Sequence, residues 1–356
     1  MAEGETIARA AGVELALVCP QCVQARGEEQ PLVRAAPQGP AAGWRCPGCG
    51  QAYGRSAGGA PVLLLPGTAG AAASGPVPAD PAAYYERART REQYLALHYP
   101  PPDADPLAAL LGPHAPPLAE RYPLAVPALW RAAREPAGER RAPEQPGDAT
   151  SAAPLAAAAL DAGAACGRLS FELAREYGLV FGLDRSLGLI DAALAVQADG
   201  VARYERVIEG ELTEAVEVAL ELEPAVRGRV RFVVGDALAL PFPAGSFALV
   251  LALNLLDRVG EPRRLLAELA RVTAPGGMLL VGSPYTWLEE FTPRPHWLGG
   301  LRDERGQARR GAQAVREALG AGWSLVREDE LLFFIPHHAR SGQLGRTHVQ
   351  SFRRQR

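Results

Sequence analysis

Three apolar runs that each end in an aspartate limit most strongly how this chain can fold. The runs and their acids are residues 155–160 with Asp161, residues 179–183 with Asp184, and residues 230–234 with Asp236. Apolar residues at helical spacing follow the first two runs, which is the alternation typical of an α/β fold. Because parallel strands end at one edge of a sheet, the pattern predicts an α/β fold with three carboxylates at its ligand-binding edge.

A glycine turn follows the first run. Gly163 and Gly167 allow the backbone to pass close to a ligand, but their spacing is not the Gly-x-Gly-x-x-Gly of a dinucleotide site. Asp161 stands before the first glycine instead, and a carboxylate there suits a cationic ligand. Asp184 follows about 20 residues later, where an acid can accept hydrogen bonds from two ribose hydroxyls. If the turn is considered alone, the alternative to a ligand-binding turn is a structural strand, turn and helix that binds no ligand.

These three strand ends resemble the S-adenosylmethionine pocket of class I methyltransferases. The resemblance implies a Rossmann-like, mostly parallel seven-stranded sheet with helices on both faces. It places Asp161 at the methionine end of the cofactor, Asp184 at the ribose, and the turn of Asp236 and Ala237 at the adenine. The cofactor-binding residues that it implies are Asp161, Gly163, Gly167, Asp184, Asp236, Ala237 and Asn254.

Four of the five cysteines form two Cys-x-x-Cys turns, namely Cys19 with Cys22 and Cys46 with Cys49. Each turn directs two thiolates at one point, and two such turns complete a tetrahedral site of the kind that holds structural zinc. Two disulfides or a rubredoxin-like iron centre are the alternatives. Residues 44–53 resemble the small zinc ribbon that activates several methyltransferases, although zinc ribbons also occur as rRNA-binding heads.

Composition excludes some classes of function. The 356 residues, of which 48% are hydrophobic, suffice for two domains with a core, and the net charge of −3 argues against a protein that chiefly grips a phosphate backbone. No apolar run is long enough to cross a membrane, and the first residues do not resemble a secretory signal. We therefore expect a cytoplasmic protein with a small-molecule substrate and no nucleic-acid or membrane partner.

Changes in composition divide the chain into four parts. We expect a zinc ribbon at 1–67, a flexible linker at 68–81, a helical lid segment at 82–154 with a charged, proline-broken mobile loop at 134–154, and the methyltransferase domain at 155–356. Residues 84–99 are predicted to form a helix with an aromatic face that includes His98. Such a helix commonly covers the substrate pocket of class I methyltransferases, and plain packing of His98 in the core is the alternative.

A loop rich in aromatic and acidic residues, 283–300, follows the predicted strand 278–281. The strand at 247–253 delivers Asn254 to the same edge of the sheet. Buried aromatic rings with polar ends suit a planar cationic or zwitterionic substrate, whereas a rigid loop packed for stability is the alternative. The candidate catalytic residues are Tyr285, Trp287, Glu289, Glu290 and Asn254, with Arg294 and Arg340 as candidates for binding a carboxylate.

Several segments resemble the C-terminal methyltransferase domain of the ovothiol biosynthesis enzyme OvoA, from about residue 84 to the end of the chain. They are residues 93–99, 161–173, 209–212, 254–256, 283–293 and 338–340. Ala165, which stands where many methyltransferases have glycine, fits this family. The resemblance implies N-methylation of a ring nitrogen of 5-thiohistidine by S-adenosylmethionine. The sulfoxide synthase half of that family has no counterpart here, so we expect a separate sulfoxide synthase to supply the thiohistidine.

Two other functions are compatible with the sequence. One is methylation of rRNA or tRNA, with the zinc ribbon binding the RNA. The other is a catalytically inactive partner that uses the domain for assembly, which a failure to bind the cofactor would indicate. The sequence does not identify a general base.

Overall fold

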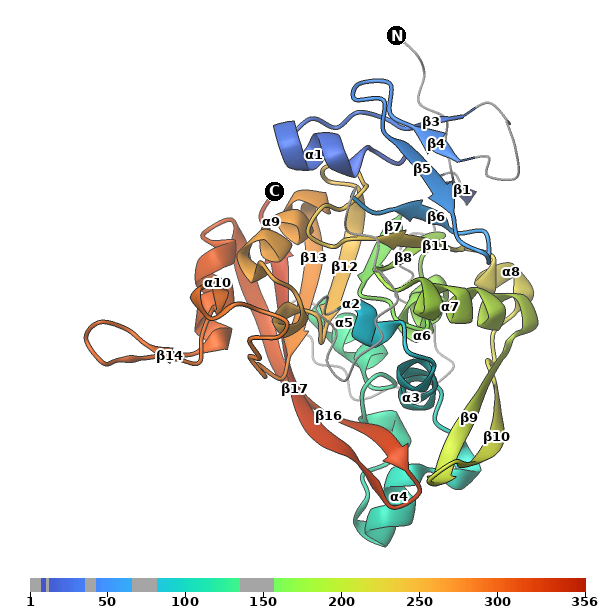
Figure 1. Cartoon of the computed structure of the whole chain (residues 1–356). Helices are drawn as coiled ribbons and strands as arrows, with labels where there is room; N and C mark the ends of the chain where they lie inside the picture. The colour runs from blue at the N-terminus through green and yellow to red at the C-terminus, as the bar shows by residue number, and fades with distance from the viewer. Residues whose placement is uncertain (1–7, 11–12, 36–42, 66–81, 135–156) are drawn as a thin grey trace.

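The computed structural model describes residues 8–10, 13–35, 43–65, 82–134 and 157–356 (Figure 1). Its central feature is an 11-stranded sheet in the order β16-β17-β13-β12-β7-β8-β11-β6-β5-β4-β3. The first seven of these are β16 (Trp323–His338), β17 (Ser341–Arg354), β13 (Thr273–Ser283), β12 (Phe247–Leu253), β7 (Ala158–Ala162), β8 (Leu179–Asp184) and β11 (Val230–Gly235). The strands from β13 to β11 pair in parallel, and β17 is antiparallel to both of its neighbours. The predicted Rossmann-like α/β fold is therefore confirmed.

Two hydrophobic clusters lie on opposite faces of this sheet. Successive side chains of a strand point to opposite faces, and Val180 belongs to one cluster whereas Phe181 belongs to the other. The first cluster takes residues from α3 (Ala88–His98), α5 (Val126–Arg134), α6 (Arg168–Ala174) and α7 (Leu187–Asp199), and the second from α9 (Pro262–Val272) and α10 (Gly311–Leu319). Burial on both faces explains why β7, β8 and β12 are almost continuously apolar.

The cysteine-rich segment extends the same sheet. Strand β6 (Pro61–Leu63) pairs in parallel with β11, so that Val62 faces Val234 and Leu63 faces Gly235. Strands β5 (Ala52–Arg55), β4 (Trp44–Arg45) and β3 (Val33–Arg34) continue the sheet in antiparallel pairs. The buried Trp44 also belongs to the second hydrophobic cluster, so this segment shares a core with the rest of the molecule.

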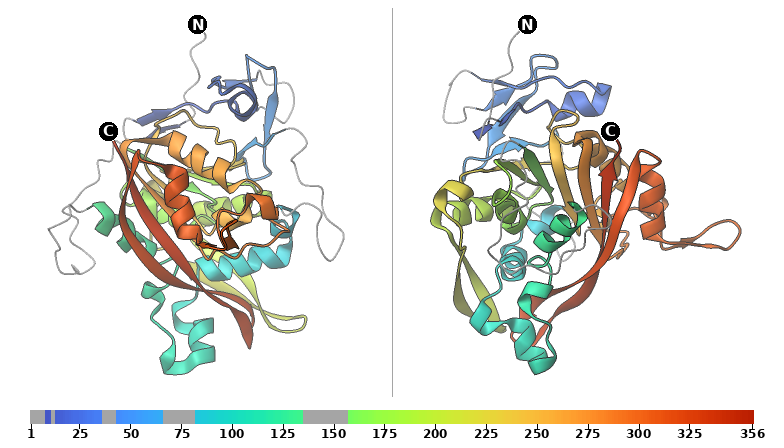
Figure 2. Two further views of the ribbon diagram at one scale, coloured as in Figure 1. Left: turned by 90° about the vertical axis from the view of Figure 1, so that its left-hand side faces the viewer. Right: turned by 180° about the vertical axis from the view of Figure 1, so that it is seen from behind.

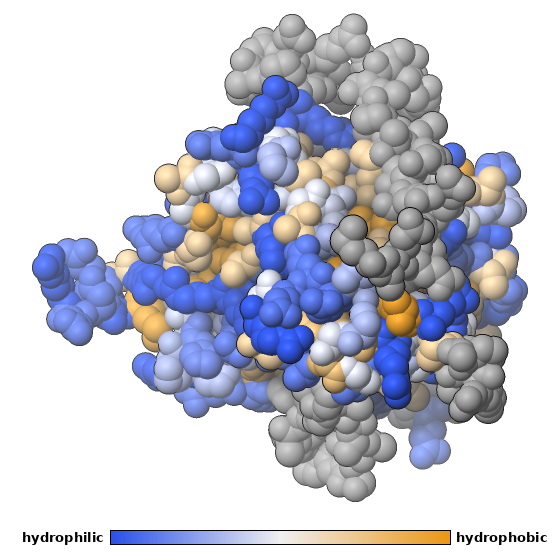
Figure 3. All heavy atoms as spheres, turned by 90° about the horizontal axis from the view of Figure 1, so that it is seen from above, coloured by the Kyte–Doolittle hydropathy of each residue, from blue (hydrophilic) through white to orange (hydrophobic). Residues whose placement is uncertain are grey.

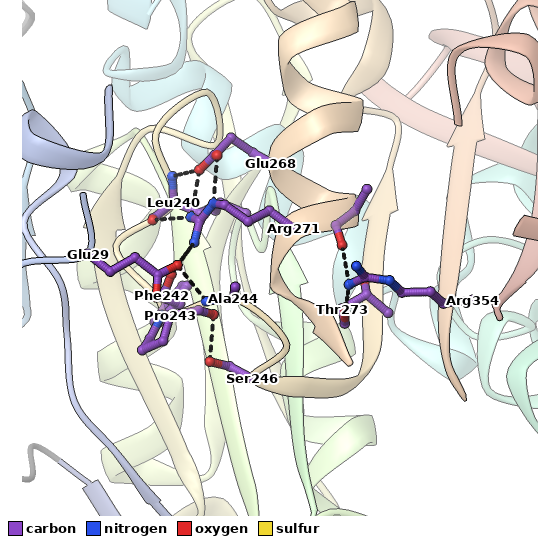
Figure 4. Close-up of polar contacts among 11 residues, drawn as sticks. Glu29, Leu240, Phe242, Pro243, Ala244, Ser246, Glu268, Arg271, Thr273 and Arg354 are labelled. Atoms are coloured by element: carbon purple, nitrogen blue, oxygen red, sulfur yellow. Dashed lines mark hydrogen bonds and ion pairs between the residues drawn. The ribbon is translucent and has the colours of Figure 1, made fainter. Parts of the chain in front are cut away.

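A polar network adds to this contact (Figure 4). The guanidinium of Arg271 on α9 donates to Glu268 on the same helix and to Glu29 of the cysteine-rich segment, each at 2.8 Å. Arg271 also donates to the backbone oxygens of Leu240 and Phe242. One charged side chain thus joins three segments that are far apart in the sequence.

The predicted helix at 84–99 is divided in the structure. Helix α2 (Ala82–Tyr85) ends before α3 begins at Ala88, and α4 (Pro106–Leu111) and α5 follow. Between α2 and α3, the carboxylate of Glu86 accepts hydrogen bonds from the backbone of Leu187 and Gly188 at the start of α7. Because a helix N-terminus carries partial positive charge, this contact fixes α2 and α3 against the end of β8. The predicted linker 68–81 and most of the predicted loop 134–154 lie outside the described residues.

Two hairpins extend beyond the sheet on either side of α3. One is the long pair β16 and β17, and the other is β9 (Val201–Glu209) with β10 (Leu212–Ala219), which the sequence did not reveal as strands (Figures 1 and 2). Smaller elements are β1 (Ala8–Ala10), β2 (Val13–Leu15), α1 (Pro20–Arg26), α8 (Pro224–Arg227), β14 (Leu301–Arg302) and β15 (Ala308–Arg309). Helix α3 contacts a strand of each hairpin, β9 and β16.

Among the residues described, no helix has the length and apolar character needed to cross a bilayer. Seen from above, the surface mixes hydrophilic and hydrophobic residues (Figure 3).

Candidate functional site

A cavity of about 720 Å³ opens at the carboxyl edge of the parallel strands. Its floor comes from the strand ends, with Gly163, Asp184, Asp236 and Asn254, and its roof comes from α2 and α3. The loop after β13 and the β16–β17 hairpin close its sides. Pockets that hold a cofactor or a small substrate typically measure about 300–1,000 Å³, so there is room for both.

The glycine turn after β7 is held by β8. The backbone N–H groups of Gly163 and Ala164 donate to the carbonyl oxygen of Leu183, at 2.8 and 2.9 Å. Gly163 lines the cavity with a φ of 82°, a conformation that favours glycine. Gly167 does not line it; a Cβ there would lie 2.6 Å from the ring of Phe232. The two glycines therefore differ: Gly163 lines the cavity, whereas Gly167 leaves room for the ring of Phe232.

Asp184 lies at the end of β8 and lines the cavity. Its carboxylate accepts hydrogen bonds from the backbone of Ala165 and Ser186, both at 2.9 Å, and burial raises its pKa. These two bonds orient the group and use only part of the acceptor capacity of its two oxygens. The remaining lone pairs are available to a ligand with two hydroxyls.

Asp161 is buried below the cavity rather than on its lining. It is 3% exposed and accepts a hydrogen bond from the hydroxyl of Ser170 at 2.7 Å. Burial in this apolar environment raises its pKa to about 7. Its predicted position at the methionine end of a cofactor stays a prediction.

The ends of β11 and β12 complete the floor. Asp236 and Ala237 both line the cavity, and Asp236 accepts a hydrogen bond from the backbone of Leu238 at 2.9 Å, which shapes the turn. Asn254, with a φ of 57°, accepts a hydrogen bond from the hydroxyl of Thr347 at 2.6 Å. Its amide oxygen is thereby occupied, and its amide nitrogen is left as a donor.

The aromatic loop divides into two parts. Glu289 and Glu290 line the cavity, whereas Tyr285 and Trp287 do not. The hydroxyl of Tyr285 lies 3.1 Å from Nδ1 of His348, and Trp287 is buried in a stack on Trp297. These two rings pack the loop against the protein, which is the structural role that the sequence left open as the alternative. Arg294 and Arg340 are exposed and also lie outside the lining.

The tyrosines of the lining come from residues 84–122 instead, and Phe291 of the loop and Phe333 of β16 also line the cavity. Tyr85, Tyr94 and Tyr122 line the cavity together with His98, whose ring meets that of Tyr122 edge-on at 6.1 Å. His98 is 3% exposed, and its Nδ1 has no hydrogen-bond partner in the described part of the chain. Burial and the nearby charge of Arg168 lower its pKa to about 3, so the ring is neutral at pH 7. In the sequence, only the aromatic face predicted for residues 84–99 indicated that aromatic side chains would line this side of the cavity.

The four thiols of the cysteine-rich segment lie close together. The Sγ atoms of Cys19, Cys22, Cys46 and Cys49 are all within 4.8 Å of one another, and none of them forms a disulfide. The separations are 3.7 Å between Cys19 and Cys49 and 3.6 Å between Cys22 and Cys46. A tetrahedral ion with Zn–S bonds of about 2.3 Å holds its sulfurs about 3.8 Å apart. The cluster therefore fits a zinc ion with no open coordination position.

Comparisons with known proteins agree with this fold. Residues 160–281 match the model of a family described as a methyltransferase domain. A 69-residue segment is 41% identical to a protein named probable tocopherol O-methyltransferase from Oryza sativa subsp. japonica, over 19% of this chain and 18% of that protein. Another, of 55 residues, is 49% identical to a demethylmenaquinone methyltransferase from Renibacterium salmoninarum, over 15% of this chain and 23% of the relative. Residues 160–281 of the chain are thus similar to a methyltransferase domain.

The matches are partial. The chain spans less than a quarter of the length of these two relatives. Among solved structures, a SAM-dependent methyltransferase from Methanosarcina mazei aligns with a TM-score of 0.38 at 19% identity, over 56% of this chain and 92% of that one.

A first prediction concerns the thiol cluster. Purified protein should contain about one equivalent of zinc by metal analysis, and Cys46→Ser should lose the metal and lower the thermal midpoint, because metal binding contributes to the folding of such a segment. Cys166→Ala is the matched control, since this buried thiol lies outside the cluster and should leave the zinc content unchanged. Iron with visible absorbance, or no metal at all, would contradict the assignment.

A second prediction follows from the raised pKa of Asp161. Its folded-state pKa of about 7 exceeds the unfolded value near 3.9, so this group's contribution to the free energy of unfolding is complete at acid pH and is lost as the pH rises through 7. Asp161→Asn keeps an acceptor for Ser170 without the titration. The wild type should therefore lose about 2–3 kcal/mol relative to this variant between pH 5 and pH 8, measured by urea unfolding. Parallel pH profiles for the two proteins would refute it.

Proposed function

We propose that this chain is an S-adenosylmethionine-dependent N-methyltransferase that methylates a ring nitrogen of a small thioimidazole amino acid, 5-thiohistidine. The observation that carries the methyltransferase part is the cavity at the carboxyl edge of the matched domain, where Asp184, Asp236 and Asn254 meet. Support for the acceptor comes from the resemblance of the chain to the ovothiol methyltransferase domain and from the chemistry of the cavity walls.

The floor residues suit the cofactor. Asp184 would accept hydrogen bonds from the ribose hydroxyls, and the turn of Asp236 and Ala237 would hold the adenine. Gly163 would let the cofactor approach the backbone. Bound S-adenosylmethionine supplies an electrophilic methyl group. The chain's own task is then chiefly to hold the acceptor nitrogen in line with that methyl group, and this positioning alone can account for much of the rate.

The walls suit a small zwitterionic acceptor. Glu289 and Glu290 would attract an ammonium group and would repel a phosphate backbone. The rings of Tyr85, Tyr94 and Tyr122 offer flat apolar surfaces to an aromatic heterocycle. The same acids disfavour the alternative acceptors, rRNA and tRNA.

Cofactor binding gives a third prediction. A hydrogen bond to a charged group contributes about 1.5–3 kcal/mol, so Asp184→Ala should weaken S-adenosylmethionine binding by about two orders of magnitude in calorimetry. Asp191→Ala is the control: this acid on α7 accepts a hydrogen bond from Ser56 at 2.7 Å, lies outside the cavity, and should leave the affinity unchanged. An unchanged affinity in a folded Asp184→Ala protein would remove the assignment, and a wild type that binds no cofactor would favour an inactive assembly partner.

The acceptor gives a fourth prediction. With 5-thiohistidine and S-adenosylmethionine supplied, mass spectrometry should detect one added methyl group on a ring nitrogen, and histidine should react far more slowly. Moderate salt should barely change the rate, because no counterion release from a phosphate backbone is involved. Turnover only with bulk RNA that collapses on addition of salt would show instead that the protein is an RNA methyltransferase.

A further inference from the structure

Arg258 brings a positive charge to the cavity. It ends the short helix η4 (Leu256–Arg258) that follows Asn254, and it lines the cavity. Its side chain is only 20% exposed, and its Nη1 atom is buried with no hydrogen-bond partner in the described ranges. A buried donor of a charged group without a hydrogen-bond partner is costly, so a guanidinium whose Nη1 has none in the free protein favours an added anion.

The neighbouring acid, Asp257, forms an ion pair with Arg258 but accepts no hydrogen bond from it. Asp257 is fully buried, and its two carboxylate oxygens already accept hydrogen bonds from the hydroxyl of Ser283 and the backbone of Thr286, at 2.8 and 3.1 Å. The nearest approach of Arg258 to it is 3.9 Å, from Nη2, which is beyond hydrogen-bond distance. Asp257 therefore anchors the loop after β13 and accepts no hydrogen bond from the guanidinium of Arg258.

The guanidinium is held in a defined place. Its central carbon lies 4.8 Å from the centre of the Phe291 ring, which belongs to the loop that Asp257 anchors. Stacking on an aromatic face orients the planar donors of arginine and leaves their edges available for a two-point contact. A carboxylate matches that edge with two parallel hydrogen bonds.

The charges around Arg258 select the kind of anion. Asp184, Asp236, Glu289 and Glu290 line the same cavity, as does a second arginine, Arg185, and the four acids would repel a phosphate that carries two negative charges. They favour a ligand that presents one carboxylate to Arg258 and an ammonium or hydroxyl groups to the acids. That description fits an α-amino acid.

We propose that Arg258 is the residue of this cavity that binds the α-carboxylate of an amino-acid ligand. The carboxylate has two possible sources, the methionine part of the cofactor and the acceptor amino acid. Neither Arg294 nor Arg340, which the sequence suggested for this role, lines the cavity. The choice of these two ligands rests on the proposed function, whereas the anion site itself rests on the guanidinium whose buried Nη1 has no hydrogen-bond partner in the described residues.

The test compares each ligand with its decarboxylated form in wild-type protein and in Arg258→Met. Calorimetry measures the affinity for S-adenosylhomocysteine and for its decarboxylated analogue, and then for 5-thiohistidine and 5-thiohistamine with S-adenosylhomocysteine bound. In the wild type, removal of the carboxylate should weaken one of the two ligands by about 30-fold or more, the range expected for charge-assisted hydrogen bonds. In Arg258→Met that penalty should fall below about threefold, and Arg258→Lys should restore part of it.

Controls separate binding from folding. Arg340→Met, in which an exposed arginine outside the cavity is changed, should keep the full carboxylate penalty, and thermal melts should show that every variant is folded. The ligand whose penalty disappears identifies the source of the carboxylate. Equal penalties in wild-type protein and in Arg258→Met, for both ligands, overturn the proposal.

The outcomes also separate this site from the proposed function. A wild type that binds S-adenosylhomocysteine through Arg258 but never methylates 5-thiohistidine supports the carboxylate site and refutes the acceptor. Methylation of 5-thiohistidine with no effect of Arg258→Met on either carboxylate penalty supports the function and refutes the site. A protein that binds neither ligand refutes both.

Discussion

The parallel pairing of β7 with β8 and β12 is the constraint on which the rest of the structure depends. All three strands are buried on both faces, so their registers are fixed by packing on two sides at once. The pairing brings Leu183 under the glycine turn, where its carbonyl oxygen accepts two backbone hydrogen bonds. As a result, the carboxylate of Asp184 meets the backbone of Ala165, a residue held at a φ of 45°. The floor of the cavity is therefore set by backbone geometry before any ligand contributes.

The cysteine-rich segment belongs to the same physical unit. Its strand β6 pairs with β11, the strand whose end carries Asp236, and Arg271 ties its Glu29 to α9. A ribbon joined only by a flexible chain would bury its own small core, whereas here Leu17 and Leu32 share a cluster with Leu160 and Phe181 of the central strands. The packing around the four thiols and the order at the edge of the sheet are coupled through these contacts, because a shared core cannot loosen on one side alone.

Local rules account for the features that could be predicted from the sequence. Acids placed directly after apolar strands mark the carboxyl edge of a parallel sheet, and paired Cys-x-x-Cys turns mark a metal cluster, because each pattern fixes geometry over a few residues. The roles suggested for Tyr285 and Trp287 depended on side-chain direction, which composition does not encode. Tyr285 has a φ of 53° and turns toward His348, so the aromatic half of the loop packs inward while Glu289 and Glu290 reach the cavity.

Arg258 is a residue of the cavity that the sequence analysis did not single out. Nothing in the sequence distinguishes it from the other arginines, and Arg294 and Arg340 sit within segments that looked more specific. Its position in the cavity depends on contacts that only the structure reveals. Asp257 accepts hydrogen bonds from Ser283 and Thr286, and the guanidinium of Arg258 lies over the ring of Phe291. A net charge of −3 describes the whole surface and says little about a single cavity. Acids and the two arginines Arg185 and Arg258 line the same cavity, so the electric field that a ligand meets there depends on the positions of these charges rather than on their sum.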